Sequence, residues 1–449
     1  MENTVASIWK WSVVSLLPMA LTSCGISGVS PSEEVVAAAQ AGSEYVSCQF
    51  PTDVPAASAP KTEFDKYGWR MFTALNRPAG SQRGEPDCSR PLGSTADTVW
   101  RSYKLVDEIF LPNAQNPGPW DSGYNAGSTV IDEISKVASE VQATVNQPVG
   151  GWLIDQRDNP TYYQIAANQI SYDYIVDNGL YNKNTAQSFA LIDFPDFATE
   201  VKAGWRILEA GDDTSRYLTI PATVATFDSQ GNKNGTADVT LGLVGLHIIT
   251  KAKGFPQWVW ATFEQVDNVT SAPGVFSSYY DPSAPAGKVN QSPCLNHATP
   301  CVPVPGTTFQ TPNPLTRVTA IADSTASVNN AAQAQLQNTF LQYYQLITTQ
   351  RPADPNDPGN PAGTPTPGVA ANVTMESYIQ PTSSCMDCHS TAVVKPGKKS
   401  DFSFLFLHAQ APSSCSTCHS GSEIKQAGSY DAAFIEKHLK DVAGKPSKK

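Results

Sequence analysis

The stretch DVTLGLVGLHIITKAKGFPQWVWATFEQV, residues 238–266, decides the expected fold. Residues 238–251 and 257–266 alternate in the manner of β-strands, and the loop KAKGFPQ between them predicts an antiparallel hairpin. Just before it, YLTIPATVATF at 217–227 has the same alternation and predicts another strand. We therefore expect an antiparallel sheet in the middle of the chain.

Helical periodicity flanks these strands on both sides. Apolar residues spaced by three and four predict helices at 63–76, 97–110, 128–145 and 328–349, and the tyrosine-rich segment 160–178 is a further candidate. Aromatic stripes at this spacing are typical of a packed core. The sequence thus predicts an α+β domain over residues 61–350, a large mixed domain of antiparallel strands and packed helices.

Composition sets the expected limits of this domain. Residues 25–60 are rich in Ala, Ser, Pro and Glu, which predicts a flexible tether. Residues 351–371 are rich in Pro and Gly, which predicts a linker without helix or strand. Residues 372–449 would then form a small, mostly helical C-terminal domain.

Two short motifs in that C-terminal segment carry the clearest chemistry. CMDCH at 385–389 and CSTCH at 415–419 both have the C-x-x-C-H spacing of c-type haem attachment. Two thiols bind the vinyl groups of one porphyrin, and the adjacent histidine is the proximal iron ligand. Zinc is the alternative, but 26 residues separate the pairs and zinc needs no histidine after each. We expect two covalent haem c groups, held by Cys385, Cys388, Cys415 and Cys418 with proximal His389 and His419.

The two motifs belong to a 30-residue repeat. Shifting residues 380–408 by 30 positions gives identity at 11 of 29 residues, as expected for a duplicated unit. Each unit ends in D-x-x-F-x-x-x-H, where the Asp (Asp401 in the first unit) is expected to cap a short helix. His408 and His438 are therefore the first candidates for distal iron ligands, the alternative being surface histidines.

Other candidates lie outside the repeat. His247, in the middle of a predicted strand, is either a buried core histidine or a distal ligand donated by the large domain. Gly245 on the same face would then leave room for a porphyrin edge. Met375 and Met386 are weaker distal candidates. Glu264 and Asp267 are possible acid–base residues, but carboxylates at a strand end are usually solvated, and no catalytic residue is assigned.

The N-terminus predicts export. An apolar run from Trp11 to Leu21 precedes LTSC, which resembles the signal of a bacterial lipoprotein lipidated at Cys24; residues 1–24 would be the signal peptide. An ordinary secretory signal is the alternative. Four further cysteines suggest two disulfides in an oxidising compartment, with three possible pairings. The pairing closest in sequence joins Cys48 to Cys88 and Cys294 to Cys301.

Charge is unevenly distributed along the chain. Residues 385–449 contain nine lysines and six acidic residues, whereas the whole chain has a net charge of −11. An acidic body argues against nucleic-acid binding, and a lysine-bearing haem segment suits an acidic redox protein partner. The alternative is a merely solvated tail.

Several stretches resemble a group of largely uncharacterised bacterial exported proteins with a C-terminal c-type haem motif. They include FDKYGWRMFTALNRPA, LVGLHIITK and CMDCH with its following DFSFLF. The resemblance implies an exported haem c protein and raises the expectation that His247 is an iron ligand. The CSTCH unit has no counterpart in that pattern.

These features predict a dihaem cytochrome c that transfers electrons between redox partners in the cell envelope. It would lie in the periplasm or at the outer membrane, held by a lipid anchor on Cys24. One alternative is a haem-dependent oxidoreductase of peroxidase or oxidase type, with its substrate bound by residues 61–350. Another is a binding module whose haems sense redox state.

Overall fold

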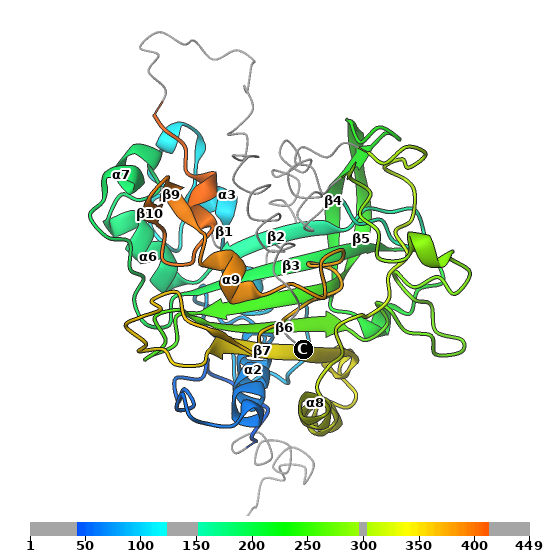
Figure 1. Cartoon of the computed structure of the whole chain (residues 1–449), viewed down its shortest axis with the longest axis horizontal. Helices are drawn as coiled ribbons and strands as arrows, with labels where there is room; N and C mark the ends of the chain where they lie inside the picture. The colour runs from blue at the N-terminus through cyan, green and yellow to red at the C-terminus, as the bar shows by residue number, and fades with distance from the viewer. Residues whose placement is uncertain (1–42, 124–150, 296–302, 413–449) are drawn as a thin grey trace, which may run out of the picture. The chain divides into compact units, whose positions relative to one another are not determined.

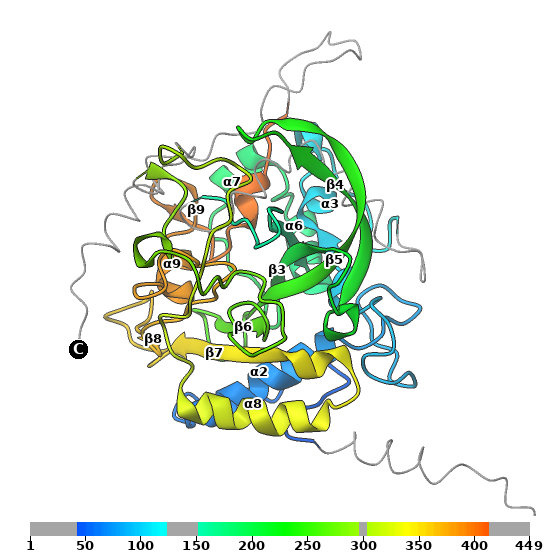
Figure 2. The same ribbon diagram turned by 90° about the vertical axis from the view of Figure 1, so that its right-hand side faces the viewer.

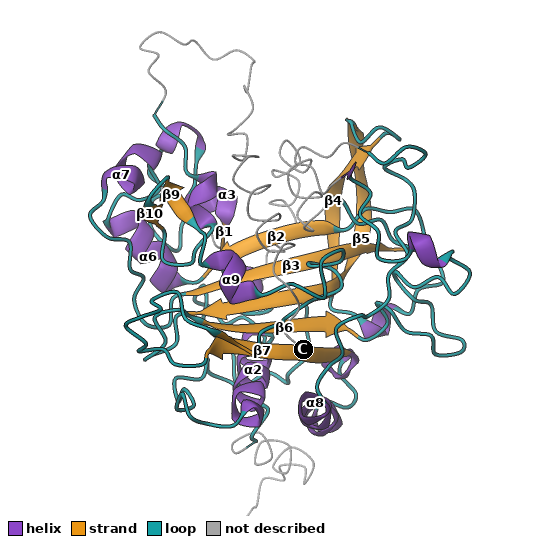
Figure 3. Cartoon of the chain, viewed as in Figure 1, coloured by secondary structure: helices purple, strands orange, loops and turns teal. Residues whose placement is uncertain are grey.

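An antiparallel β-sheet organises the protein (Figures 1 and 3). The computed structural model describes residues 43–123, 151–295 and 303–412. Among these residues the strand order is β1-β2-β3-β5-β6-β7-β8, with β4 paired to β5, and β9 and β10 form a separate hairpin. The strands are β1 (Lys104–Leu105), β2 (Tyr162–Ala167), β3 (Thr199–Leu208), β4 (Thr219–Phe227), β5 (Lys233–Thr250), β6 (Val259–Gln265), β7 (Tyr344–Pro352), β8 (Pro365–Thr366), β9 (Val393–Lys395) and β10 (Lys398–Lys399).

Strand β5 is the central element of the sheet. Its first half pairs with β4 and is largely exposed up to Thr240, whereas residues 241–250 are all buried and residues 245–250 lie between β3 and β6. This explains the nearly continuous apolar run LGLVGLHII, since a strand covered on both faces has no solvent side for polar residues. The predicted strands and the antiparallel hairpin of β5 and β6 are confirmed.

Helices surround the sheet. The α-helices are α2 (Lys61–Leu75), α3 (Val106–Ile109), α6 (Gln169–Asp177), α7 (Lys183–Ser188), α8 (Asp323–Gln335) and α9 (Cys385–His389). Short 3₁₀ helices are η1 (Trp100–Ser102), η2 (Pro112–Ala114), η4 (Thr214–Arg216), η5 (Ala286–Lys288), η7 (Phe340–Tyr343) and η8 (Leu405–His408). No helix in the described ranges is both long and apolar enough to span a membrane.

Helices α2 and α8 lie side by side against β6 and β7 and cover what we call the helical face (Figure 2). Phe263 of β6 stacks on Phe72 of α2, with ring centroids 4.2 Å apart. The buried carboxylate of Asp65 joins the layers: it pairs with Lys61 at 2.7 Å and accepts a hydrogen bond from the Thr325 hydroxyl of α8 at 2.8 Å. The predicted helix at 63–76 is thus confirmed, and its aromatic stripe is core.

Residues 370–409 cover the opposite face, here called the C-terminal face. Side chains alternate along a strand, so Gly245 and His247 of β5 share this face with Trp260 and Thr262 of β6. Thr262 accepts a hydrogen bond from the side chain of Asn372 at 3.0 Å, and Trp260 contacts His389. The segment therefore belongs to the same core as the sheet, and residues 43–412 fall within one compact unit.

The α+β class is confirmed for the large domain, but two predicted helices are wrong. Residues 97–110 contain η1, the short strand β1 and the single turn of α3, because Lys104 and Leu105 pair with β2. Residues 328–349 divide into the end of α8, the turn η7 and the start of β7. The β-branched run from Ile347 to Thr349 favours a strand, and pairing with β6 stabilises it. Segment 160–178 contains β2 and α6, and residues 128–145 lie outside the described residues.

Both segments expected to be flexible pack against the domain where they are described. Within 351–371, β8 pairs with β7, and Ala370 and Ala371 are buried, so these residues do not separate two domains. The tether likewise ends earlier than expected: Tyr67 of α2 donates a hydrogen bond to Pro51, and a disulfide joins Cys48 to Cys88. The described residues of the expected haem domain, 372–412, contain only short helices and the β9–β10 hairpin, so they are not mostly helical.

Gly245 serves a different purpose from the one expected. A Cβ at this position would lie 2.2 Å from the hydroxyl oxygen of Thr374, which is itself fixed by a hydrogen bond to Asn372. Gly245 therefore makes room for the polypeptide of the C-terminal segment and not for a porphyrin edge.

Replacing Gly245 with Ala should lower the free energy of unfolding by about 1–3 kcal/mol, because the added methyl group overpacks this contact. Chemical denaturation measures the change. Gly287→Ala is the control, since a Cβ there would meet nothing within 4 Å. Adding Thr374→Ala to Gly245→Ala should recover part of the loss; no recovery would show that this contact is not the cause.

Candidate functional site

The CMDCH motif forms helix α9 on the C-terminal face (Figure 1). The Ser384 side chain caps it by accepting a hydrogen bond from the Asp387 amide at 3.1 Å. Gln350 of β7 accepts a hydrogen bond from the Met386 amide at 2.9 Å, which ties the first turn to the sheet. These contacts fix where Cys385 and Cys388 lie, one helical turn apart.

His389 is held in a defined orientation. Its Nδ1 lies 2.7 Å from the carbonyl oxygen of Phe402, and since a carbonyl only accepts, Nδ1 carries the proton. The ring packs between Trp260 and Phe404, with centroid distances of 4.4 and 4.7 Å. Burial lowers the pKa of His389 to about 4, so the ring is neutral at pH 7 with its lone pair on Nε2.

The two motif thiols are half-buried and neither forms a disulfide. Burial, followed by the charge of Glu376, raises the pKa of Cys388 to about 11 and that of Cys385 well above its ordinary value. In the folded chain both residues are therefore neutral thiols at pH 7.

Charged groups from the sheet and from the loop before α9 meet this helix. His247 of β5 is paired in register with Lys202 of β3, and both act electrostatically on His389 together with Glu376. The His247 Nε2 atom lies 3.6 Å from Glu376, too far for a good hydrogen bond, and is buried without another hydrogen-bond partner among the described residues. Burial opposes ionisation of Glu376, but the nearby His247 and Lys202 outweigh it and lower the pKa of this carboxyl.

These residues fit a covalently bound haem. Two thiols one turn apart precede a histidine whose Nδ1 donates a hydrogen bond to a backbone carbonyl, as is typical of histidines that bind a metal. A second imidazole, that of His247, acts electrostatically on His389, and its buried Nε2 has no hydrogen-bond partner among the described residues. Over the described ranges no three His, Cys, Asp or Glu side chains are grouped to hold a bare metal ion. When bound, a haem iron would supply one-electron redox chemistry.

The other expected distal ligands have different surroundings from those of His247. His408 ends η8, which packs against α3 and β9, and burial lowers the pKa of this histidine to about 4. Asp401 does not cap a helix as expected; it pairs with Lys251. Met386 is buried in the core, and Met375 packs near Gly204 of β3.

The carboxylates considered as acid–base residues have structural partners. Glu264 accepts a hydrogen bond from the Val373 amide at 2.7 Å and pairs with Arg317. Asp267 accepts two hydrogen bonds of 2.6 Å from Arg216. Cys294 is disulfide-bonded, but its partner is not described. Cys24, Cys301, Cys415, Cys418, His419 and His438 lie outside the described residues.

Sequence patterns missed Lys202, Glu376 and Glu200. Lys202 and Glu200 lie on β3, and only the register of β3 against β5 places them beside His247 and Ile249 on the C-terminal face. The alternation of side chains along β3 was the sequence signal that could have placed Glu200 and Lys202 on one face. Burial raises the pKa of Glu200 to about 8, partly offset by a hydrogen bond from Ser403, so this carboxyl is largely protonated at pH 7.

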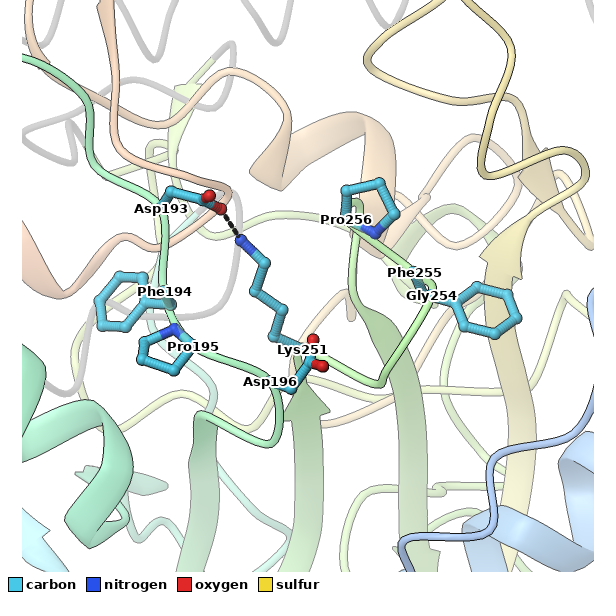
Figure 4. A pocket seen from close by; sticks show the side chains of 8 residues that line it. All are labelled: Asp193, Phe194, Pro195, Asp196, Lys251, Gly254, Phe255 and Pro256. Atoms are coloured by element: carbon cyan, nitrogen blue, oxygen red, sulfur yellow. Dashed lines mark hydrogen bonds and ion pairs between the residues drawn. The ribbon is translucent and has the colours of Figure 1, made fainter.

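A shallow pocket of about 400 Å³ opens at the end of β5 (Figure 4). Its walls come from the loop before β3 and the β5–β6 loop, and Lys251 reaches across to Asp193. The motif residues do not line it.

No family model matches this chain, and neither a curated protein nor a solved structure is significantly similar to it.

The buried carboxyl of Glu200 predicts a pH-dependent stability. The unfolded side chain ionises near pH 4.5, whereas the folded one retains its proton up to about pH 8. The native state binds more protons across this window, so the free energy of unfolding should fall as pH rises, by up to about 1.4 kcal/mol per pH unit. Denaturation between pH 4.5 and 8 measures the slope.

Glu200→Gln should reduce this slope, leaving stability similar at pH 4.5 and higher at pH 8. Glu85→Gln is the control because Glu85 is exposed. Equal slopes for the wild type and Glu200→Gln would rule out a protonated Glu200.

Proposed function

We propose that this protein is an exported dihaem cytochrome c that transfers electrons between redox proteins of the cell envelope. Cys385 and Cys388 hold one haem with His389 as its proximal ligand, and the second motif at 415–419 holds another. The observation that carries the proposal is the hydrogen bond from His389 Nδ1 to the Phe402 carbonyl, because it leaves Nε2 ready to bind iron.

Further features support export and electron transfer. The Cys48–Cys88 disulfide is typical of an oxidising compartment, in agreement with a signal peptide and a lipid anchor on Cys24. The β9–β10 hairpin directly follows the motif helix and carries Lys395, Lys398 and Lys399. Positive charge beside a haem suits docking of an acidic redox partner.

We propose His247, rather than His408, as the distal ligand of the haem on Cys385 and Cys388. A buried nitrogen without a hydrogen bond costs free energy, and iron coordination would satisfy Nε2 of His247. His247 also lies among the groups that act on His389. Two histidine ligands would close the iron to exogenous ligands, as suits electron transfer.

A haem-dependent oxidoreductase of peroxidase or oxidase type is the second candidate. It is favoured by Glu376, which lies 3.6 Å from His247 and interacts with Lys202. An imidazole next to a carboxylate can hold and move a proton at Nε2, which peroxide chemistry requires. In this case His247 would not bind iron, and the site would stay open to small ligands.

Haem content tests the attachment sites. In a host with c-type haem maturation, the full-length chain should carry two covalent haems per molecule, measured by pyridine haemochrome absorbance and intact mass. Cys385→Ala with Cys388→Ala should leave one haem, and so should Cys415→Ala with Cys418→Ala. Two haems remaining in either double variant would contradict that attachment site.

Carbon monoxide tests the distal ligand and separates the two candidate functions. The reduced wild-type spectrum should not change with the gas, because His247 would close the first iron and His438, the remaining candidate, would close the second. His247→Ala should give one high-spin haem that binds carbon monoxide, whereas the matched variant His408→Ala should behave as the wild type. If His408→Ala alone opens a haem, the His247 assignment fails. A wild-type haem that binds carbon monoxide would favour the oxidoreductase.

A further inference from the structure

The carbonyl that holds His389 lies in an unusual stretch of backbone. Asp401 and Phe402 have φ angles of 53° and 64°, in the left-handed region. Asp tolerates this region, but it is rare for a bulky residue such as Phe. Such conformations persist only where surrounding contacts enforce them.

Asp401 supplies those contacts. Its Oδ2 atom lies 2.6 Å from Nζ of Lys251 and accepts a hydrogen bond of 2.7 Å from the Phe194 amide. Both charged side chains are nearly buried, with 7% of Lys251 and 10% of Asp401 exposed. A buried charge without its partner is strongly unfavourable, so the ion pair fixes Asp401 firmly to the end of β5.

The position of Asp401 determines the direction of the next carbonyl group, that of Phe402. With Asp401 fixed, the left-handed turn directs the Phe402 carbonyl to His389 Nδ1 at 2.7 Å. Ser403 then donates its amide back to Ser400 at 3.1 Å, which closes the turn.

We propose that Lys251 and Asp401 are positioning residues for His389, which they orient through the Phe402 carbonyl. This inference rests on the proposed haem attachment at Cys385 and Cys388. A hydrogen bond from Nδ1 makes the imidazole more basic, and this stabilises the ferric iron and lowers the reduction potential. The ion pair would thus set the potential of one haem from outside the haem pocket.

The test uses the haem-loaded full-length protein with Lys251→Met. Spectroelectrochemical titration should show one potential shifted upward and the other unchanged. Lys61→Met is the matched control: it also removes a lysine paired with a buried aspartate, at 2.7 Å, but on the helical face. Lys251→Arg keeps the charge and should restore the wild-type potential. Unchanged potentials in Lys251→Met would overturn the inference.

Asp401→Asn covers the case in which Lys251→Met does not fold. Asn tolerates the left-handed conformation and still accepts a hydrogen bond, but it removes the charge opposite Lys251. The same upward shift is expected, and a folded Asp401→Asn with wild-type potentials would also overturn the inference.

Mass analysis of the peptide containing Cys385 and Cys388 separates this inference from the proposed function. A peptide without haem would refute haem attachment there. Nitrogen NMR of His389 in the same chain would then decide the positioning role: the Nδ1-protonated tautomer should dominate in the wild type and be lost in Lys251→Met. An unchanged tautomer would overturn the inference.

Discussion

The contact between β5 and residues 372–374 is the constraint on which the site depends. Gly245 has no side chain, which lets Thr374 approach the strand. Glu264, which is paired with Gly245 on β6, accepts a hydrogen bond from the Val373 amide. The Asn372 side chain completes the attachment by donating to the Phe263 carbonyl at 2.9 Å. Because the motif helix begins at Cys385, eleven residues after Thr374, these contacts help to determine where its thiols lie relative to the sheet.

The sheet in turn brings together residues that are far apart along the chain. Lys202, His247 and Glu376 meet only because β3 pairs with β5 and the C-terminal segment crosses both. The large domain is therefore more than a support for an independent haem segment. It supplies one face of the candidate haem site, together with Trp260 against the proximal histidine.

The part of the fold predicted from sequence is the part with strong local periodicity. Residues 238–266 alternate clearly, and the hairpin followed from that pattern. The segment after Gln335 was misread because Leu336, Phe340 and Tyr343 have spacings that fit a helix as well as a turn before a strand. A β-branched run was the contrary signal, but pairing with β6 is a tertiary effect that a single segment does not contain.

The site residues that could be predicted from sequence are likewise those that belong to a local pattern. Adjacent residues with a fixed chemical spacing, such as those of CMDCH, were recognisable at once. His247 was recognisable as a buried histidine, but its proximity to His389 was not, and Lys202 and Glu376 had no pattern of their own. The expected flexible linker shows a related limit: Pro and Gly predict the absence of regular structure, whereas Ala370 and Ala371 are buried in an irregular but packed segment.

The raised pKa values of Cys385 and Cys388 have a consequence for biogenesis. Thioether formation is favoured by a reactive, accessible sulfur, and closure of the C-terminal segment over the sheet makes both sulfurs half-buried neutral thiols. If the proposed haem is attached to these thiols, its ligation would be easier before this closure than after it. In that case the docking of the C-terminal segment on the sheet would come last, with the haem already in place.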